Sequence, residues 1–245
     1  MDFHGQSAFI TGASVGIGRA VALLLAQRGA QVSLCDINYE KLELVKAELS
    51  EYTKDVLIFK CDVSDEECVN TCIKKTEEAF GKVDILVNNA ALWRFCSPFV
   101  ETPTEQWKML LDINVMGTVY PTKAVLPGML ERKYGRIINV ASIAGVIGNA
   151  NMVHYSATKG AVISMTQALA KEVSVNGITV NSVAPGSVSN SSDEDIDAWQ
   201  PSELSFVGRT GTDRENAELI CFLASKEAAY ISGENIRIDG CRKRM

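Results

Sequence analysis

The chemistry most readily drawn from this sequence is that of a tyrosine and a lysine four residues apart. Tyr155 and Lys159 are separated only by small side chains. In a helix, residues at this spacing lie on one face, about one turn apart. A free tyrosine has a pKa of about 10, and a nearby cation lowers it by stabilising the phenolate. We therefore expect either an ordinary helix surface or a phenol tuned toward neutral pH, a general base for alcohol oxidation and a general acid for carbonyl reduction.

Two polar side chains elsewhere are candidates to assist this pair. Ser142 follows the apolar run that ends at Val140, so it falls at the carboxyl end of an expected strand, where open α/β sheets place their sites. Its hydroxyl could hold a substrate oxygen, although strand-end serines are also common turn residues. Asn114 lies inside an apolar-periodic helical stretch, residues 105–130, where an amide is costly unless it is hydrogen-bonded. By itself, Asn114 is compatible with a satisfied core amide.

A glycine-rich turn follows the first expected strand and predicts a phosphate site. Its sequence is Thr11-Gly12-Ala13-Ser14-Val15-Gly16-Ile17-Gly18. Glycines let the backbone turn tightly and let a pyrophosphate approach, and the helix that begins there directs free N–H groups at the anion. The same glycines also suit a simple tight turn. Assigning a phosphate site therefore needs further evidence, which the end of the second strand provides.

Asp36 ends that second strand, about twenty residues further on. A carboxylate there can accept hydrogen bonds from both hydroxyls of an adenosine ribose, and it would repel a 2′-phosphate. Val15 provides no basic side chain for such a phosphate. Arg19 could supply one, which is a minor argument for NADP(H). We therefore expect NAD(H) and not NADP(H); the alternative is that Asp36 caps the helix that opens near Tyr39.

Short apolar runs alternate with amphipathic stretches along the whole chain. The expected strands are residues 8–10, 31–35, 56–60, 85–87, 136–140, 179–183 and 236–238. Such alternation predicts one α/β domain with a doubly wound parallel sheet of about seven strands and helices on both faces. We divide residues 1–245 into a mainly dinucleotide-binding half, 1–140, and a half with the catalytic residues, 141–245. The alternation of strands and helices is interrupted by a polar, acidic segment, so we expect a lid at about residues 187–207.

The composition excludes several other classes. The 245 residues are 47% hydrophobic and carry a formal net charge of −6, which indicates a globular protein without a nucleic-acid footprint. No apolar run is long enough to span a membrane. Seven scattered cysteines without a C-x-x-C, and only two histidines, predict free thiols in the cytoplasm and no metal.

The spacing Gly-x-x-x-Gly-x-Gly resembles the cofactor turn of the short-chain dehydrogenase/reductase family, and the likeness extends along nearly the whole chain. The matching motifs are Cys61-Asp62-Val63, Asn88-Asn89-Ala90-Ala91, Asn114, Ser142, the Tyr155/Lys159 pair and Pro185-Gly186. The resemblance implies a catalytic set of Asn114, Ser142, Tyr155 and Lys159, with Asn114 anchoring a water that links Lys159 to solvent. It also implies cofactor contacts from Gly12, Ser14, Val15, Gly16, Ile17, Gly18, Asp36, Asp62, Val63, Asn89, Tyr155, Lys159, Gly186 and Val188.

The resemblance further implies a hydride transfer between a secondary alcohol and a ketone. The pocket-side segments 92–95 and 143–147 are apolar apart from Arg94, which suits a hydroxysteroid or a similar alicyclic substrate. The five carboxylates of the lid should repel phosphorylated carriers, which disfavours the alternative, an NADPH-linked 3-oxoacyl-carrier-protein reductase. A non-catalytic NAD-binding regulator is a third possibility. Relatives pair the helices near 105–130 and 153–175 between subunits, so we expect a homo-oligomer, either a dimer or a tetramer.

The chain departs from the family pattern at three places. Ala91 replaces the usual glycine of N-N-A-G, Cys241 replaces the second glycine of D-G-G, and Asn190 stands where a threonine often contacts the cofactor. All four catalytic positions match, so we expect these departures to affect the substrate and the subunit surface, not the reaction class.

Overall fold

A computed structural model describes residues 1–189 and 195–243. The seven strands are β1 (Ser7–Thr11), β2 (Gln31–Asp36), β3 (Val56–Lys60), β4 (Ile85–Asn88), β5 (Gly135–Val140), β6 (Ile178–Pro185) and β7 (Asn235–Ile238). All neighbours pair in parallel, in the order β3-β2-β1-β4-β5-β6-β7. The order reverses between β1 and β4, and open α/β sheets bind ligands at such a switch point. The predicted single-domain, doubly wound fold is confirmed.

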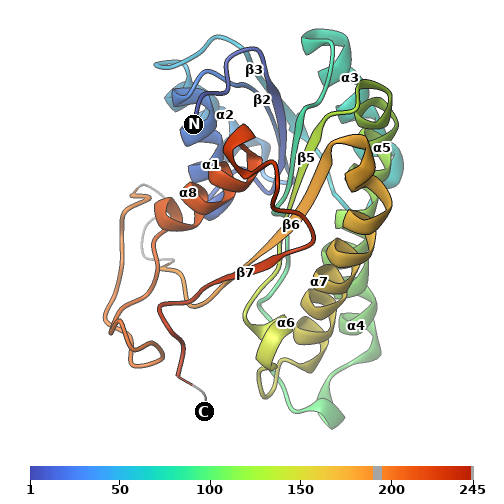
Figure 1. The fold of residues 1–245 in the computed structure, drawn as a ribbon. Coiled ribbons are helices and arrows are strands. Elements are labelled where there is room, and N and C mark those ends of the chain that lie inside the picture. Colours follow the sequence, from blue (N-terminus) through green and yellow to red (C-terminus); the bar gives the residue numbers. More distant parts are fainter. Residues whose placement is uncertain (190–194, 244–245) are drawn as a thin grey trace.

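Helices cover both faces of the sheet (Figure 1). The helices are α1 (Gly16–Gln27), α2 (Tyr39–Leu49), α3 (Glu66–Phe80), α4 (Thr104–Leu110), α5 (Gly117–Arg132), α6 (Ala144–Ile147), α7 (Val153–Val173) and α8 (Asp213–Ala224). One apolar core lies between the sheet and α1, α2 and α8, and a second lies between the sheet and α3, α5 and α7. The central strands β1, β4, β5 and β6 are buried along their whole length, as expected for a parallel sheet covered on both faces.

Short helical turns complete the connections. The π-helical turn η2 (Leu111–Met116) joins α4 to α5, and the 3₁₀ turns are η1 (Phe99–Glu101), η3 (Ser174–Asn176) and η4 (Lys226–Ala228). The sequence predicted one continuous helix over residues 105–130, so the π turn is a departure from that expectation. None of the described helices is long and apolar enough to cross a bilayer.

Candidate active site

The glycine turn between β1 and α1 has the form that a phosphate site requires. Gly12 and Gly16 have φ angles of +64° and +59°, which disfavour other residues. A Cβ on Gly12 would lie 2.7 Å from the Cα of Ala90, and one on Gly18 would overlap the Gly12 carbonyl. Helix α1 begins after Val15 with no side-chain cap and no acidic residue in its first turn. Its first N–H groups therefore remain available to an anion.

Asn89 connects this turn to β4 across the switch point. Its side-chain Nδ2 donates to the carbonyls of Thr11, at 3.1 Å, and Gly12, at 2.8 Å. In return, the Thr11 hydroxyl accepts hydrogen bonds from the backbone N–H groups of Asn89 and Ala90, both at 3.0 Å. The sequence analysis did not recognise the role of Thr11, although a hydroxyl at the end of a strand was its available signal. These bonds hold the turn and the N-N-A-A segment in fixed positions.

Asp36 ends β2 and does not cap a helix. The N-cap of α2 is Asn38, whose side chain accepts from the N–H of Lys41. The Asp36 carboxylate accepts from the N–H of Ser14 at 3.2 Å and from that of Asn38 at 2.9 Å. A carboxylate has about four acceptor positions, so both oxygens can accept further bonds. The helix-cap alternative therefore does not describe the structure.

Arg19, the residue that argued for NADP, is held by a carboxylate. Its guanidinium forms a two-pronged ion pair with Glu48 of α2, with N–O distances of 2.9 and 2.8 Å. A 2′-phosphate would have to compete with this bidentate pair for the guanidinium.

Asp62 and Val63 follow β3 at the same edge of the sheet. The Asp62 carboxylate accepts from the N–H and hydroxyl of Ser64, which fixes the loop. Val63 is buried against Gly117 of α5, where a Cβ would lie 2.6 Å from a Val63 methyl. These contacts hold in position the loop that carries Asp62 and Val63, two of the expected cofactor contacts.

The Ser142 side chain lies near enough to the Tyr155 phenol to lower its pKa, and its hydroxyl accepts a hydrogen bond from the Ala144 N–H at 3.1 Å. Ser142 lies just beyond β5, and Tyr155 lies in the first turn of the long helix α7. Close packing of α6 on α7 keeps them together, because a Cβ on Gly145 would lie 2.6 Å from the Lys159 carbonyl carbon. The structure thus brings the serine and the phenol to the carboxyl edge of the sheet, as the sequence analysis expected.

In the cofactor-free protein, Lys159 alone does not lower the pKa of Tyr155. Burial raises this pKa, and the Ser142 side chain lowers it only in part. The lowering predicted from the sequence also requires the positive charge of oxidised nicotinamide. The Lys159 Nζ atom donates to the Val140 carbonyl at 2.7 Å and lies 5.9 Å from the centre of the tyrosine ring. Burial also lowers the pKa of Lys159 to about 8. The phenol therefore keeps its proton at neutral pH.

Asn114 lies in the π-helical turn η2 and is fully buried. Its amide exchanges two hydrogen bonds with the backbone of Leu92, at 2.7 and 2.9 Å, and donates to the Thr158 hydroxyl at 3.1 Å. The Thr158 hydroxyl in turn donates to the carbonyl of Tyr155. Asn114 thus links the loop after β4 to the catalytic helix, and π turns are frequent at functional sites.

Gly186 and Val188 follow β6 beside the same edge. A Cβ on Gly186 would lie 2.8 Å from the Cα of Asp239, and Val188 forms a bridge with Gly211. Asn190 lies outside the described residues. These contacts hold the segment against the residues that follow β7 and those that precede α8.

One carboxylate of the lid is paired with a cation from outside it: Asp197 with Arg214 of α8 at 2.8 Å. Asp193 and Glu194 lie outside the described residues. The C-terminal segment runs along the lid, where the Lys243 N–H donates to the Leu204 carbonyl at 2.9 Å and the Lys243 ammonium lies 5.4 Å from the centre of the Phe206 ring. These two cations weaken the expected repulsion of phosphorylated carriers.

His154 is buried and packs on Trp107, with ring centres 5.8 Å apart. Burial lowers its pKa. The structure therefore places His154 in the packing between α4 and α7.

Comparisons with known proteins agree with this geometry. A family model described as short chain dehydrogenase matches residues 6–201. The chain is 38% identical over 243 residues to the 3-oxoacyl-[acyl-carrier-protein] reductase of Vibrio cholerae and 36% identical to that of Escherichia coli, each alignment covering 98% of both chains. It is 36% identical over 242 residues to nodulation protein G of a Rhizobium strain, with 98% of this chain and 97% of the relative covered.

A solved structure also matches the fold of nearly the whole chain. A crystal structure of NAD⁺-bound xylitol dehydrogenase superposes with a TM-score of 0.90 and 30% identity, covering 98% of this chain and 100% of the other. This chain belongs to the short-chain dehydrogenase/reductase family and is an oxidoreductase.

Proposed function

We propose that this protein is an NAD(H)-dependent carbonyl reductase that acts on 3-oxoacyl thioesters, with Tyr155 as the general acid. The observation that supports the reaction class is the buried Tyr155 phenol, whose pKa is raised by burial so that it keeps its proton, beside Ser142 at the carboxyl edge of the sheet. The substrate class rests on the carrier-protein reductases among its relatives. The hydroxysteroid substrate expected from the sequence has no such support, and we do not retain it.

The turn residues suit a dinucleotide. Gly12, Gly16 and Gly18 would let a pyrophosphate approach the backbone of the turn, and Asp36 would accept hydrogen bonds from the ribose hydroxyls. The remaining proposed contacts are Ser14, Val15, Ile17, Asp62, Val63, Asn89, Tyr155, Lys159, Gly186 and Val188. Bound NADH would supply the hydride. The choice of NAD over NADP rests on the Asp36 carboxylate and on the Arg19–Glu48 pair.

Side chains of the protein would transfer the proton. Ser142 would hold the substrate carbonyl oxygen, and Tyr155 would donate its proton to that oxygen as charge develops there. Lys159 is buried and cationic at neutral pH, so it would stabilise the phenolate that remains. Asn114 positions helix α7 through Thr158.

A second candidate is oxidation of a polyol or other secondary alcohol. The NAD⁺-bound xylitol dehydrogenase with the same fold favours it. The same residues would then act in reverse, with Tyr155 as the base. In this direction the raised pKa of Tyr155 would be a disadvantage unless a bound cation lowered it.

One panel of activity assays distinguishes these candidate functions. Purified protein would be assayed with NADH and a short 3-oxoacyl thioester, with NAD⁺ and xylitol, and with NAD⁺ and apolar secondary alcohols. We expect thioester reduction to have the highest kcat/KM. A higher value for xylitol would support the second candidate, and NAD binding without turnover on any substrate would indicate a regulator.

We also propose a cytoplasmic homo-oligomer that pairs α5 and α7 between subunits. Light scattering at micromolar concentration would test this, and a monomer would contradict it.

A further inference from the structure

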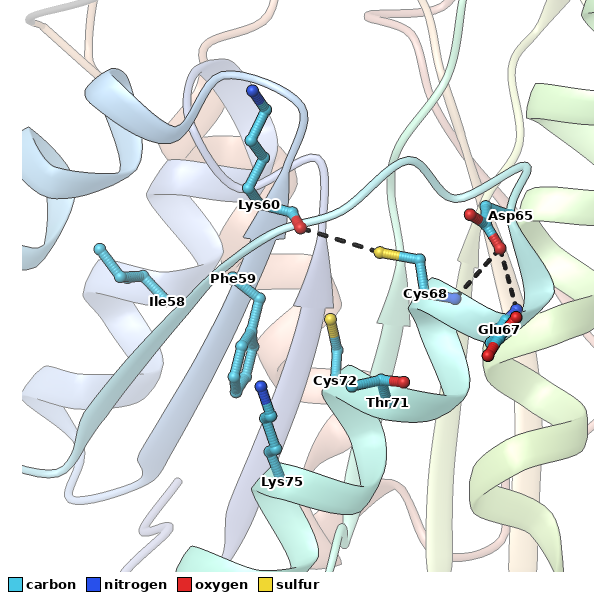
Figure 2. A pocket seen from close by; sticks show the side chains of 9 residues that line it. All are labelled: Ile58, Phe59, Lys60, Asp65, Glu67, Cys68, Thr71, Cys72 and Lys75. Carbon is cyan, nitrogen blue, oxygen red and sulfur yellow. Dashed lines mark hydrogen bonds between the residues drawn. The ribbon is translucent and has the colours of Figure 1, made fainter.

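Three cysteine thiols converge beside the outer strand of the sheet. Cys61 directly follows β3, and Cys68 and Cys72 lie one turn apart on α3. Their Sγ atoms all lie within 4.8 Å of one another. Figure 2 shows the thiols of Cys68 and Cys72 directed into the space between β3 and α3. The sequence analysis expected scattered thiols, so this convergence is a correction that required the tertiary fold.

The cluster borders a surface cavity of about 360 Å³ between β3 and α3. Cys61 and Cys72 are buried, whereas Cys68 is partly exposed and its thiol donates to the Lys60 carbonyl at 3.8 Å. Cys68 and Cys72 line this cavity, so a small ion or a water can approach the cluster from the side of these two sulfurs.

We propose that Cys61, Cys68 and Cys72 form a binding site for a thiophilic divalent cation of the Zn²⁺ class. Three thiolates at a metal–sulfur distance of about 2.3 Å would have their sulfurs about 3.8–4.0 Å apart. The observed limit of 4.8 Å requires the sulfurs to close by less than about an ångström, which small side-chain rotations allow. The fourth position would face the cavity and take a water.

The surrounding charges suit such a complex. Three thiolates and one divalent cation carry a net charge of −1, and the Lys75 side chain lines the same cavity and interacts electrostatically with Cys72. The nearby Asp65 carboxylate is already used to cap α3, accepting from the N–H groups of Glu67 and Cys68 at 3.0 and 3.1 Å (Figure 2). Soft thiolate ligands, rather than that hard carboxylate, would therefore define the site.

A disulfide switch is the less favourable use of these thiols. Mutual contact and burial raise the pKa of Cys61 and Cys72, with Cys35 as the first contact of Cys61 and Cys61 as that of Cys72. The thiolate is the form that reacts with oxidants, so protonated thiols are slow to oxidise. Metal binding also requires deprotonated thiols, so the observation that favours a cation is the convergence of three sulfurs, of which a disulfide would use only two.

The position of the cluster gives the cation a structural consequence. The Cys61 N–H donates to the Asp36 carbonyl at 3.0 Å, and Asp62 follows directly. A cation held by Cys61 and by helix α3 would therefore fix the sheet edge that carries Asp36 and Asp62. The site itself does not depend on the proposed activity.

The test uses the full-length, reduced, metal-free protein titrated with Cd²⁺ and with Zn²⁺. Cd²⁺ bound to thiolates gives a charge-transfer absorption band in the ultraviolet, and Zn²⁺ binding would be followed by competition with a chromophoric chelator. We expect one equivalent of either ion, with three fewer thiols open to a thiol-titrating reagent. We also expect a higher melting temperature, because a ligand that binds only the folded state stabilises it.

The variants assign the ligands. Cys68→Ser, at the partly exposed position, should keep the fold by circular dichroism and weaken Cd²⁺ binding at least about tenfold. Cys72→Ser should do the same. The controls Cys96→Ser, at an exposed site, and Cys221→Ser, at a buried site on α8, should bind Cd²⁺ as the unaltered protein does. Absence of the charge-transfer band in the unaltered protein, or its full retention in folded Cys68→Ser, would overturn the proposal.

Discussion

The Lys159 Nζ atom lies 5.9 Å from the centre of the Tyr155 ring, while its hydrogen bond goes to the Val140 carbonyl at 2.7 Å. The two side chains share one face of α7, yet the ammonium is anchored to the end of β5. Burial therefore determines the state of each group in the free protein: the phenol is protonated, and the ammonium has a lowered pKa. Such a site is prepared to donate a proton, which is the requirement of carbonyl reduction.

Replacing Tyr155 by phenylalanine should remove the proton donor and leave the fold intact. We expect Tyr155→Phe to bind NADH normally, as measured by nucleotide fluorescence, and to lose at least about 100-fold in kcat, the usual scale for a general acid. Turnover within a few-fold of normal would show that another group delivers the proton.

The pH dependence of reduction should report Lys159. Its pKa is lowered to about 8, so the ammonium is mostly charged at pH 7 and loses its proton as the pH rises through about 8. Because kcat/KM reports groups of the free enzyme, we expect kcat/KM for reduction to fall above about pH 8. A profile that stays flat to pH 10 would mean that the charge of Lys159 is not needed.

Two glycines in the α6–α7 contact form a matched pair of tests. A Cβ on Gly145 would lie 2.6 Å from the Lys159 carbonyl carbon, whereas a Cβ on Gly160 would meet its nearest atom, the Gly145 carbonyl oxygen, at 3.6 Å. We expect Gly145→Ala to move Ser142 away from Tyr155 and to lower kcat at least about tenfold, since misplacement by an ångström can cost more than that.

Gly160→Ala is the control, because it adds a methyl group at an ordinary contact distance within a helix. It should keep near-normal kcat and gain stability of up to about 1 kcal/mol from helix propensity. Equal losses in both variants, at equal melting temperatures, would show that the α6–α7 spacing does not position the serine.

The sequence was sufficient for the architecture because parallel strands buried on both faces appear as continuous apolar runs. Each strand was found to within about two residues: for example, β6 spans Ile178–Pro185 where residues 179–183 were expected. The glycine turn and Asp36 were also recognisable, since their function depends on backbone shape and on a fixed interval along the chain.

Features that depend on side-chain ends or distant partners were not predictable. The π turn at Asn114 depends on bonds to Leu92 in an irregular segment. The pKa of Tyr155 depends on where the flexible Lys159 side chain ends. The thiol cluster depends on the packing of α3 against β3, which brings Cys61 beside Cys72 without a short cysteine motif.

The preference for NAD(H) over NADP(H) rests chiefly on the Asp36 carboxylate. A 2′-phosphate carries a charge of about −1.5 to −2, and two unit charges about 4 Å apart repel by about 4 kcal/mol at an effective dielectric of 20. Half of that exceeds a tenfold preference, at 1.4 kcal/mol per decade. Asp36→Ala should therefore narrow the preference for NADH, and adding Val15→Arg should shift it further toward NADPH.

The most direct test is the ratio of kcat/KM for NADH to that for NADPH, measured in the unaltered enzyme and in Asp36→Ala with one 3-oxoacyl thioester. We expect a ratio of at least about ten in the unaltered enzyme and a clearly smaller one in Asp36→Ala. Equal use of both cofactors by the unaltered enzyme, or a ratio that Asp36→Ala leaves unchanged, would contradict the assignment of NAD(H).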